Sequence, residues 1–200
     1  MPGGDRIYLA SRSPRRHELL AQIGVAFGEL PPGDGAVDET PHPDESPAAY
    51  VVRVARAKAQ AGWRQIVTQG LPRLPVLAAD TTVALGGDIL GKPDDAAHAR
   101  RLLERLSGTT HEVLTAVAVA FEGRLDTALS VSTVEFRDLN EPEIRRYVES
   151  GEPLDKAGAY AIQGRAAVFA RAISGSYSGI MGLPLYETAQ LLRDLGIALT

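Results

Sequence analysis

Hydrophobic and polar positions alternate along the chain with two different periods, which predicts strands and helices in alternation. Apolar runs predict strands at residues 7–10, 74–79, 83–85, 89–90, 113–121, 129–136 and 168–173. Amphipathic stripes predict helices after Ser13-Pro14, from Ser46-Pro47 to near Gly62, after Asp94 or Asp95, after Asn140, and over about 185–195. We interpret 64–72 and the Gly/Ser-rich 174–182 as loops. The pattern predicts one α/β domain over residues 1–200, with its core at about 7–195.

Composition narrows the functional classes. Among 200 residues, 44% are hydrophobic and 23% charged, which excludes a disordered chain. A net charge of -4 argues against a general nucleic-acid coat and against a protein that binds anionic membranes. Cysteine is absent, so a disulfide framework, a thiol nucleophile and a cysteine zinc site are excluded. The four histidines show no HExxH spacing, which argues against a zinc hydrolase.

The start of the chain, MPGGDRIYLA, has no charged-then-apolar signal pattern. Apolar runs also fall well short of the roughly 20 residues that a membrane helix needs. We therefore expect a cytoplasmic protein that binds neither nucleic acid nor membrane.

Two motifs resemble catalytic signatures without meeting their chemical requirements. Residues 86–92, GGDILGK, have the spacing of a phosphate-binding loop, but Pro93 stands where Ser or Thr must hold Mg²⁺. A proline there also disfavours helical geometry at Lys92. Residues 175–179, GSYSG, resemble a nucleophile elbow, but their central residue is Tyr177. Neither motif supports the function that its spacing suggests.

The segment from Ser11 to Arg16, SRSPRR, lies between a predicted strand and a predicted helix. Backbone N–H groups at a helix N-terminus suit a phosphate, and Ser13 and Arg15 add a hydroxyl and a forked cationic donor. The alternative is an ordinary Ser-Pro cap beside solvated arginines. Arginine in a first helical turn opposes the helix dipole, which favours a bound anion.

Asp80 follows an apolar strand, where open α/β sheets place their ligands, although a carboxylate there can also cap a turn. Thr81 adds a hydroxyl beside it. Four further charged residues are candidates, namely Glu39, Lys58, Lys92 and Lys156. Each lysine taken alone is typical of a solvated surface position, and Glu39 is either a Mg²⁺ ligand or a solvated loop residue. Together, scattered cations and isolated carboxylates in an acidic protein fit one chemistry, in which a polyphosphate is held with Mg²⁺ and a water is directed at phosphorus.

Seven blocks of sequence, in order and spanning about residues 7–195, carry a family resemblance. They are IYLASRSPRRHELL, VVRVARAKA, LAADTTV, GKP, LSGTTHEV, PLDKAGAYAIQG and GSYSGIMGLPLYET. The chain resembles the Maf family of nucleoside triphosphate pyrophosphatases. The resemblance implies an α/β fold with an elongated mixed β-sheet flanked by helices, and two lobes around a cleft, similar to the inosine triphosphate pyrophosphatases.

The resemblance also implies hydrolysis of a nucleotide between its α and β phosphates, with Mg²⁺ or Mn²⁺ as cofactor. It assigns proton acceptance from the attacking water to Asp80. It gives catalytic roles to Asp80, Lys92, Lys58 and Arg16, substrate binding to Ser11, Ser13, Arg15, Thr81, Gln163 and Lys156, and metal binding to Glu39 and Asp80. Some members of the family are linked to arrest of septum formation, so a nucleotide-binding regulator with little turnover is the alternative function. A homodimer stays open.

Three positions resemble the branch of the family that is selective for dTTP and UTP. They are Arg15, Thr81 and Gln163. A glutamine amide both donates and accepts, so Gln163 is suited to the O4/N3 edge of uracil or thymine. Other substrates, such as CTP, pseudouridine triphosphate or 5-methyl-UTP, would leave the catalytic residues unchanged. Arg12 departs from the small residue that many relatives have, and its side chain either crowds the phosphates or points to solvent.

Overall fold

A computed structural model describes residues 6–30 and 37–199 of the chain. A seven-stranded sheet forms its centre, in the order β2-β1-β3-β5-β6-β7, with β4 paired to β3. The strands are β1 (Arg6–Leu9), β2 (Ala26–Glu29), β3 (Val76–Leu85), β4 (Asp88–Leu90), β5 (Thr110–Phe121), β6 (Arg124–Phe136) and β7 (Ala170–Ser174). β1 is parallel to β2 and β3, and the other pairs are antiparallel, so the predicted mixed sheet is confirmed.

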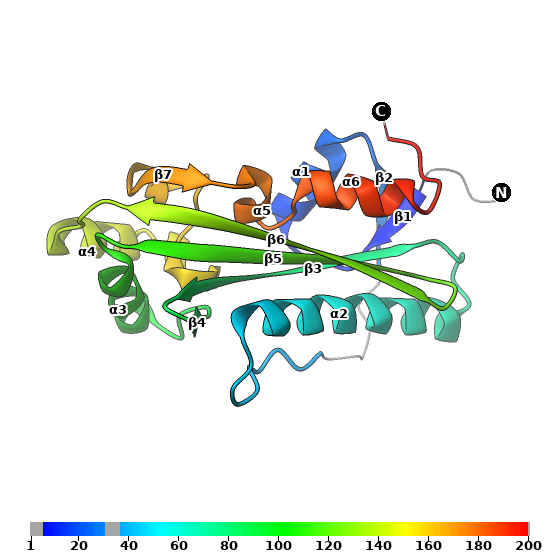
Figure 1. The fold of residues 1–200 in the computed structure, drawn as a ribbon, viewed down its shortest axis with the longest axis horizontal. Coiled ribbons are helices and arrows are strands. Elements are labelled where there is room, and N and C mark those ends of the chain that lie inside the picture. Colours follow the sequence, from blue (N-terminus) through cyan, green and yellow to red (C-terminus); the bar gives the residue numbers. More distant parts are fainter. Residues whose placement is uncertain (1–5, 31–36, 200) are drawn as a thin grey trace.

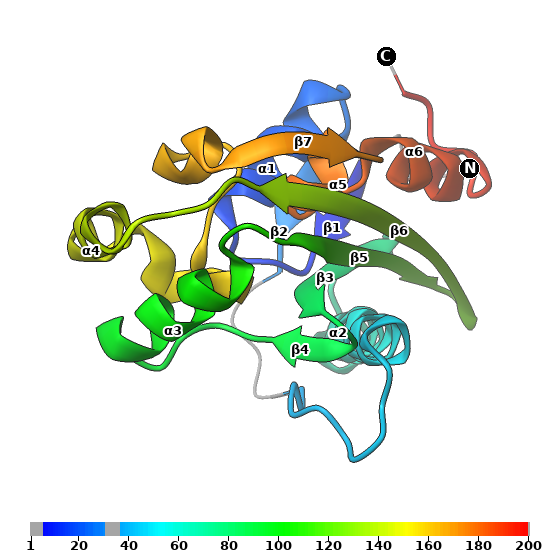
Figure 2. The ribbon, with the colours of Figure 1, turned by 60° about the vertical axis from the view of Figure 1, so that its left-hand side comes forward.

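Helices cover both faces of this sheet (Figures 1 and 2). α2 lies along one face, and α1, α5 and α6 lie on the other (Figure 1). The α-helices are α1 (Pro14–Gln22), α2 (Pro47–Gln69), α3 (Ala96–Leu106), α4 (Glu141–Glu149), α5 (Tyr177–Met181) and α6 (Leu185–Arg193). Three 3₁₀ turns connect α4 to β7, namely η1 (Glu152–Asp155), η2 (Ala157–Ala159) and η3 (Arg165–Val168).

The core consists of clusters at the two ends of the long strands and a third beneath α2. One end cluster packs α3 and α4 against β4, β5 and β6 around Phe136. The other packs α1 and α6 against β1 and β3 around Leu9 and Leu183. The third cluster is made largely of small side chains, such as Ala59 and Ala118, which let α2 lie close to the sheet. β3, β5 and β6 run through the whole molecule and connect these clusters (Figure 1).

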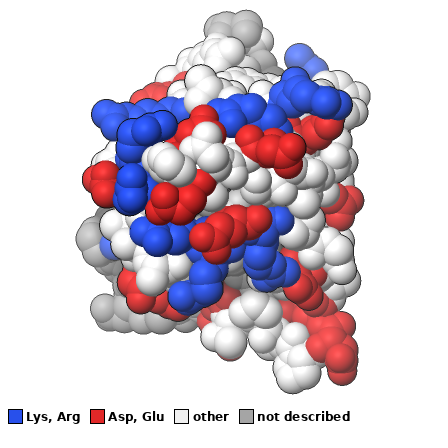
Figure 3. Space-filling model, turned by 90° about the vertical axis from the view of Figure 1, so that its left-hand side faces the viewer, with Lys and Arg blue, Asp and Glu red and all other residues white. Residues whose placement is uncertain are grey.

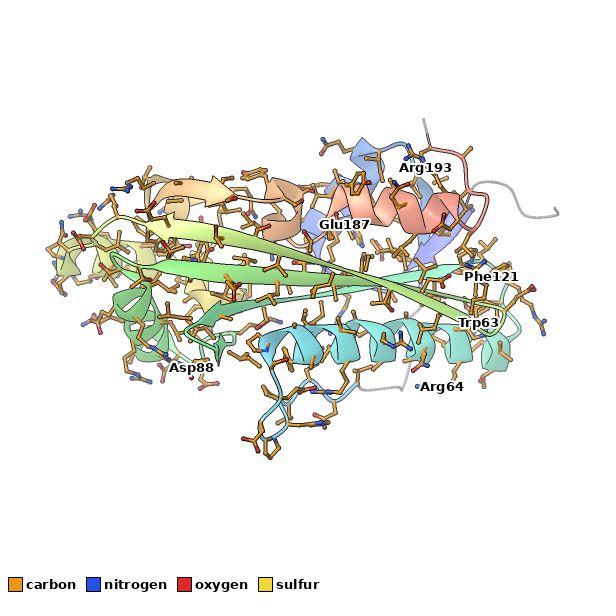
Figure 4. All side chains as sticks on the ribbon, viewed as in Figure 1. Trp63, Arg64, Asp88, Phe121, Glu187 and Arg193 are labelled. Atoms are coloured by element: carbon orange, nitrogen blue, oxygen red, sulfur yellow. The ribbon has the colours of Figure 1, made fainter. Side chains whose placement is uncertain are left out.

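Helix α2 extends beyond the end that the sequence predicts. Gly62 is not a helix stop: a Cβ atom added there would lie 2.7 Å from Leu30 Cδ1 and 2.8 Å from Val76 Cγ1, so only glycine allows this close approach. The helix continues to Gln69 and ends at Gly70, whose φ is 65°. Most of the predicted 64–72 loop is therefore helical. Beside it, Trp63 packs edge-on against Phe121, with ring centroids 5.6 Å apart (Figure 4).

Several other boundaries differ from the sequence prediction. β3 does not end before Asp80 but continues to Leu85, so Asp80 lies in mid-strand. The predicted loop 174–182 contains α5, which Ser176 caps by accepting a hydrogen bond from Gly179 N. β2 (Ala26–Glu29) is a strand that the hydrophobic pattern did not predict. Three predicted helix starts are confirmed, since Ser46, Asp95 and Asn140 each cap a helix with their side chain.

His111 lies inside the aromatic cluster at the α3–α4 end and is 2% exposed. Its Nε2 is 2.9 Å from the Tyr160 hydroxyl, and its ring packs edge-on against Phe136. Nδ1 has no hydrogen-bond partner within the described ranges. Burial therefore lowers the pKa of His111 from 6.5 to about 4.

This lowered pKa predicts a pH dependence of stability. As the pH falls, His111 becomes protonated in the unfolded chain before it does in the folded chain. The contribution of neutral His111 to stability is therefore fully present above about pH 6.5 and is lost as the pH falls toward 4. We expect the free energy of unfolding to fall by about 2 kcal/mol between pH 7 and pH 5. Urea denaturation across this range measures it, with His111→Phe as the matched variant. An equally steep slope in the variant would contradict the assignment.

Charged side chains at the end of the molecule formed by α3 and α4 are interspersed rather than separated by sign (Figure 3). Ion pairs account for part of this pattern, such as Arg137 with Glu143 at 2.7 Å and Arg171 with Glu135 at 2.7 Å. Among the described helices, none is long and apolar enough to cross a bilayer.

Candidate active site

The site begins with an interruption in strand pairing. β5 pairs with β3 from Val76 to Ala84 and occupies one edge of that strand. The other edge is shared, because β1 pairs only with Val76 and Leu77, and β4 pairs only from Val83 onward. Within the described ranges, no strand pairs with residues 78–82 on this edge. Asp80 lies at the middle of this gap, which we call the β3 gap.

Asp80 and Glu39 are held by the same ammonium group. Lys58 Nζ, on α2, donates to Asp80 Oδ1 at 2.7 Å and lies 2.8 Å from Glu39 Oε1. The side chain of Asp80 is 9% exposed, whereas that of Glu39 is 50% exposed. Burial raises the pKa of Asp80, and the charges of Lys58 and Arg16 oppose this rise.

The pKa of Glu39 moves in the opposite direction. Desolvation raises it, but the hydrogen bond from Lys58 and the charges of Lys58, Lys92 and Arg16 lower it below its usual range. Lys92 is exposed in the turn after β4 and acts on Glu39 through this charge interaction. The structure thus brings Asp80, Glu39, Lys58 and Lys92 together.

Arg16, on α1, contacts the β3 gap from the face of the sheet opposite α2 (Figure 1). Its Nε donates to the Gly182 carbonyl at 2.8 Å, and its two terminal nitrogens lie 3.4 Å from Ser11 Oγ and 3.3 Å from Thr81 Oγ1. Burial lowers the pKa of this guanidinium, and the charge of Asp80 raises it. Thr81 is fixed in turn by Thr115, whose hydroxyl lies 2.9 Å away and donates to Gly179 O at 2.7 Å.

The SRSPRR segment forms the start of α1 as predicted, with one difference. Ser13 occupies the N-cap position, but its side chain makes no capping hydrogen bond. Ser11 Oγ instead accepts from Ser13 N at 3.2 Å. Among residues 6–30 and 37–199, no hydrogen-bond partner of the Ser13 hydroxyl is found, so it is available to a ligand. Arg15 donates to the Met181 carbonyl at 3.3 Å, and Arg12 is exposed.

Lys156 and Gln163 lie on the segment between α4 and β7. Lys156 pairs with Asp155, and the charge of Arg15 also acts on Asp155. Gly158 N donates to Gly91 O at 3.1 Å, which connects this segment to the GKP turn. Gln163 is exposed. Within the described ranges, no hydrogen bond or charge interaction joins Gln163 to Asp80 or Lys58.

Two residues that sequence reasoning missed hold the loop that carries Glu39. Arg53 donates to Glu45 Oε1 at 2.7 Å, to Asp38 O at 3.1 Å and to Thr40 O at 2.9 Å. Its hydrogen bond lowers the pKa of Glu45 to about 2. Tyr50 donates from its hydroxyl to Glu39 O at 2.9 Å.

A sequence signal for these two residues does exist. Tyr50 and Arg53 stand three residues apart on α2, which places them on one face of the helix, and the polar, acidic loop segment 31–47 comes directly before it in the sequence. Residues 31–36 of that loop lie outside the described residues.

The carboxylates of the site suit a divalent cation that also binds the substrate. No group of three or more His, Asp or Glu side chains in the described ranges is arranged to hold a metal ion by itself. Asp80 and Glu39 converge on one ammonium group, however, and so supply two carboxylates to one place. Mg²⁺ is commonly bound by one or two carboxylates together with substrate phosphates. The residues present fit that arrangement.

Comparison with known proteins shows which sequences and folds resemble this chain. The family described as Maf-like protein matches residues 6–195. Similar proteins include the "dTTP/UTP pyrophosphatase" of Nitrosomonas europaea, 56% identical over 98% of both chains. Another is that of Cupriavidus metallidurans, 58% identical over 96% of this chain and 97% of the relative.

A solved structure supports the fold independently. The Staphylococcus aureus Ham1 protein has a TM-score of 0.50 and 15% identity, and the match covers 96% of this chain and 98% of that one. The likeness concerns the fold alone. The sequence relatives and the match over residues 6–195 go further, and they show that this chain belongs to the Maf family.

Proposed function

We propose that this protein hydrolyses dTTP and UTP in the cytoplasm, between the α and β phosphates, to the nucleoside monophosphate and pyrophosphate. The observation that carries the proposal is Lys58, which holds Asp80 and Glu39 together at the β3 gap opposite Arg16. The names of relatives that are 52% to 58% identical support the reaction and its pyrimidine substrates.

The positions of the site residues support the following proposed roles. Arg16, together with the Ser13 hydroxyl, binds phosphate oxygens at the start of α1. Lys92 and Lys156 supply cations at the GKP turn and its neighbouring segment, where the pyrophosphate gathers negative charge as it leaves. Arg15, Ser11 and Thr81 complete the phosphate side of the site.

Asp80 accepts the proton in this mechanism. A water oxygen forms a bond to the α phosphorus, the bond from that phosphorus to the bridging oxygen breaks, and the proton of the water passes to the Asp80 carboxylate. Burial raises the pKa of Asp80, which makes it a better proton acceptor than an exposed carboxylate. A divalent cation, Mg²⁺ or Mn²⁺, would be held by Asp80 and Glu39 and would supply charge neutralisation at the phosphates.

The test is pyrophosphate release from a panel of nucleoside triphosphates with Mg²⁺ or Mn²⁺. We expect rapid release from UTP and dTTP, slower release from CTP and purine nucleotides, and loss of activity with EDTA. Pseudouridine triphosphate and 5-methyl-UTP belong in the panel because they keep the same base edge. Nucleotide binding without release from any member of the panel would favour a regulator with little turnover.

Gln163 is proposed to bind the pyrimidine O4/N3 edge. We expect Gln163→Ala to reduce the preference for UTP over CTP by about 10-fold, because one hydrogen-bonding pair to the base is lost. The measurement is the ratio of kcat/KM values for the two substrates. An unchanged ratio would exclude Gln163 from the base edge.

A further inference from the structure

The turn that carries Gln163 is closed by its own backbone. Gly164 N donates to Ala161 O at 3.0 Å, which places Ile162 and Gln163 at the two central positions. Ile162 is buried, whereas Gln163 is exposed and makes no hydrogen bond to the described part of the chain. The backbone conformation of the turn therefore sets the direction in which the Gln163 side chain leaves the chain.

A single carboxylate holds this turn at both ends. Arg165 N, just after the turn, donates to Glu152 Oε1 at 3.0 Å and to Oε2 at 3.2 Å. At the other end, Ala161 N donates to the Tyr147 hydroxyl at 3.2 Å, and this hydroxyl donates to Glu152 Oε1 at 2.9 Å. The Tyr147 hydroxyl therefore connects the start of the turn to the carboxylate that holds its end. We call Tyr147 and Glu152 the turn clamp.

The turn clamp is closely packed. A Cβ atom added at Gly164 would lie 2.4 Å from Glu152 Oε1, so the carboxylate lies directly against the backbone of the turn. The Tyr147 ring is 4% exposed and packs edge-on against Phe169, with centroids 5.2 Å apart. Burial and the neighbouring Glu152 carboxylate raise the pKa of Tyr147, so its hydroxyl keeps the proton that it donates.

The backbone just before the turn is fixed as well. Ala159 has a φ of 59°, which is unfavourable for a residue with a side chain and persists only where the surroundings impose it. Tyr160 is anchored by its hydroxyl to His111 Nε2 at 2.9 Å. The turn is thus held in one conformation by groups that do not themselves lie at the β3 gap.

We infer that Tyr147 and Glu152 are positioning residues that determine base preference by fixing the Gln163 turn. The inference rests on the proposed function, because it assumes that Gln163 contacts the base. A turn whose backbone is already ordered loses little conformational entropy when the nucleotide binds. A loose turn must be ordered when the nucleotide binds, and it also lets the Gln163 amide adapt to the cytosine edge, so the preference for UTP over CTP falls.

The experiment is a double-mutant cycle on the ratio of kcat/KM for UTP to that for CTP. Tyr147→Phe removes one hydroxyl and keeps the ring that packs on Phe169. We expect it to lower the ratio by about 5-fold, through the KM for UTP, with kcat retained. In the Gln163→Ala background, Tyr147→Phe should lower the ratio no further, because the turn clamp acts through Gln163.

Two further variants separate positioning from a general structural effect. Tyr186→Phe removes an exposed hydroxyl on α6 and is expected to leave the ratio unchanged. A purely structural role of Tyr147 would reduce thermal stability and slow both substrates equally, which would leave the ratio unchanged and overturn the inference. Should Tyr147→Phe fail to fold, Glu152→Gln decides in its place, since its amide supplies one acceptor fewer to the same donors.

The outcomes distinguish this inference from the function on which it rests. A ratio lowered by Gln163→Ala but not by Tyr147→Phe would overturn the turn clamp and leave the base contact standing. A ratio unchanged by Gln163→Ala would overturn both. Absence of pyrophosphate release from every nucleotide would overturn the proposed function itself.

Discussion

Asp80→Asn is expected to lower kcat for UTP by about 1,000-fold, since the amide cannot accept the proton of the attacking water. The substitution keeps the shape of the side chain, and its amide oxygen can still accept the hydrogen bond from Lys58 Nζ that Asp80 Oδ1 accepts at 2.7 Å. Arg16 and Lys92 are unchanged, so nucleotide binding should persist. Pyrophosphate release measures the rate, and calorimetric titration with a non-hydrolysable UTP analogue measures binding.

Asp126→Asn is the matched control for this loss. Asp126 pairs with Arg124 at 2.9 Å near the start of β6, a strand that β5 separates from β3, and its side chain is 35% exposed. The control should retain the rate of the unaltered protein. An Asp80→Asn variant with full rate would remove Asp80 from proton transfer.

Lys58→Met is expected to lower kcat by about 100-fold, because it removes the cation that holds Asp80 and Glu39 in place. The side chain of Lys58 is only 20% exposed, and methionine fills a similar volume, so the main change is electrostatic. Loss of one partner also leaves the buried carboxylate of Asp80 without its ammonium. We therefore expect a lower thermal midpoint as well as a lower rate.

Arg124→Met tests whether the loss of any ion pair would have this effect. Arg124 is 55% exposed and its ion pair is a surface pair, which contributes little to stability. Its rate and thermal midpoint should be nearly unchanged. A Lys58→Met variant that is destabilised but keeps most of its rate per folded molecule would assign Lys58 to stability alone.

Much of the fold was accessible from local sequence signals. Caps such as Asn140, with its reciprocal partner Glu143, are encoded within a few residues, and the structure confirms them. The predicted end of α2 near Gly62 was wrong, because the sequence alone does not reveal why residue 62 is a glycine. The reason is a contact with Leu30 and Val76, which approach the helix only after folding.

The site could be predicted in part for a related reason. The resemblance to the family identified Asp80 and Lys58 as site residues, and the structure brings the two together. The expected position of Asp80 at the end of a strand was wrong, because β3 continues to Leu85. The opening at Asp80 arises because β1 and β4 share one edge of β3 without meeting. Such a gap depends on pairing between distant segments, which local periodicity does not report.

The continuity of the long strands has a mechanical consequence. Because β3, β5 and β6 each run unbroken from one end cluster to the other, the two halves of the protein share one hydrogen-bonded plate. A hinge between the halves would have to bend that plate across the β3 gap. Any movement that closes around a nucleotide is therefore expected in segments that border the β3 gap, such as the loop that carries Glu39, where hydrogen exchange with and without ligand would detect it.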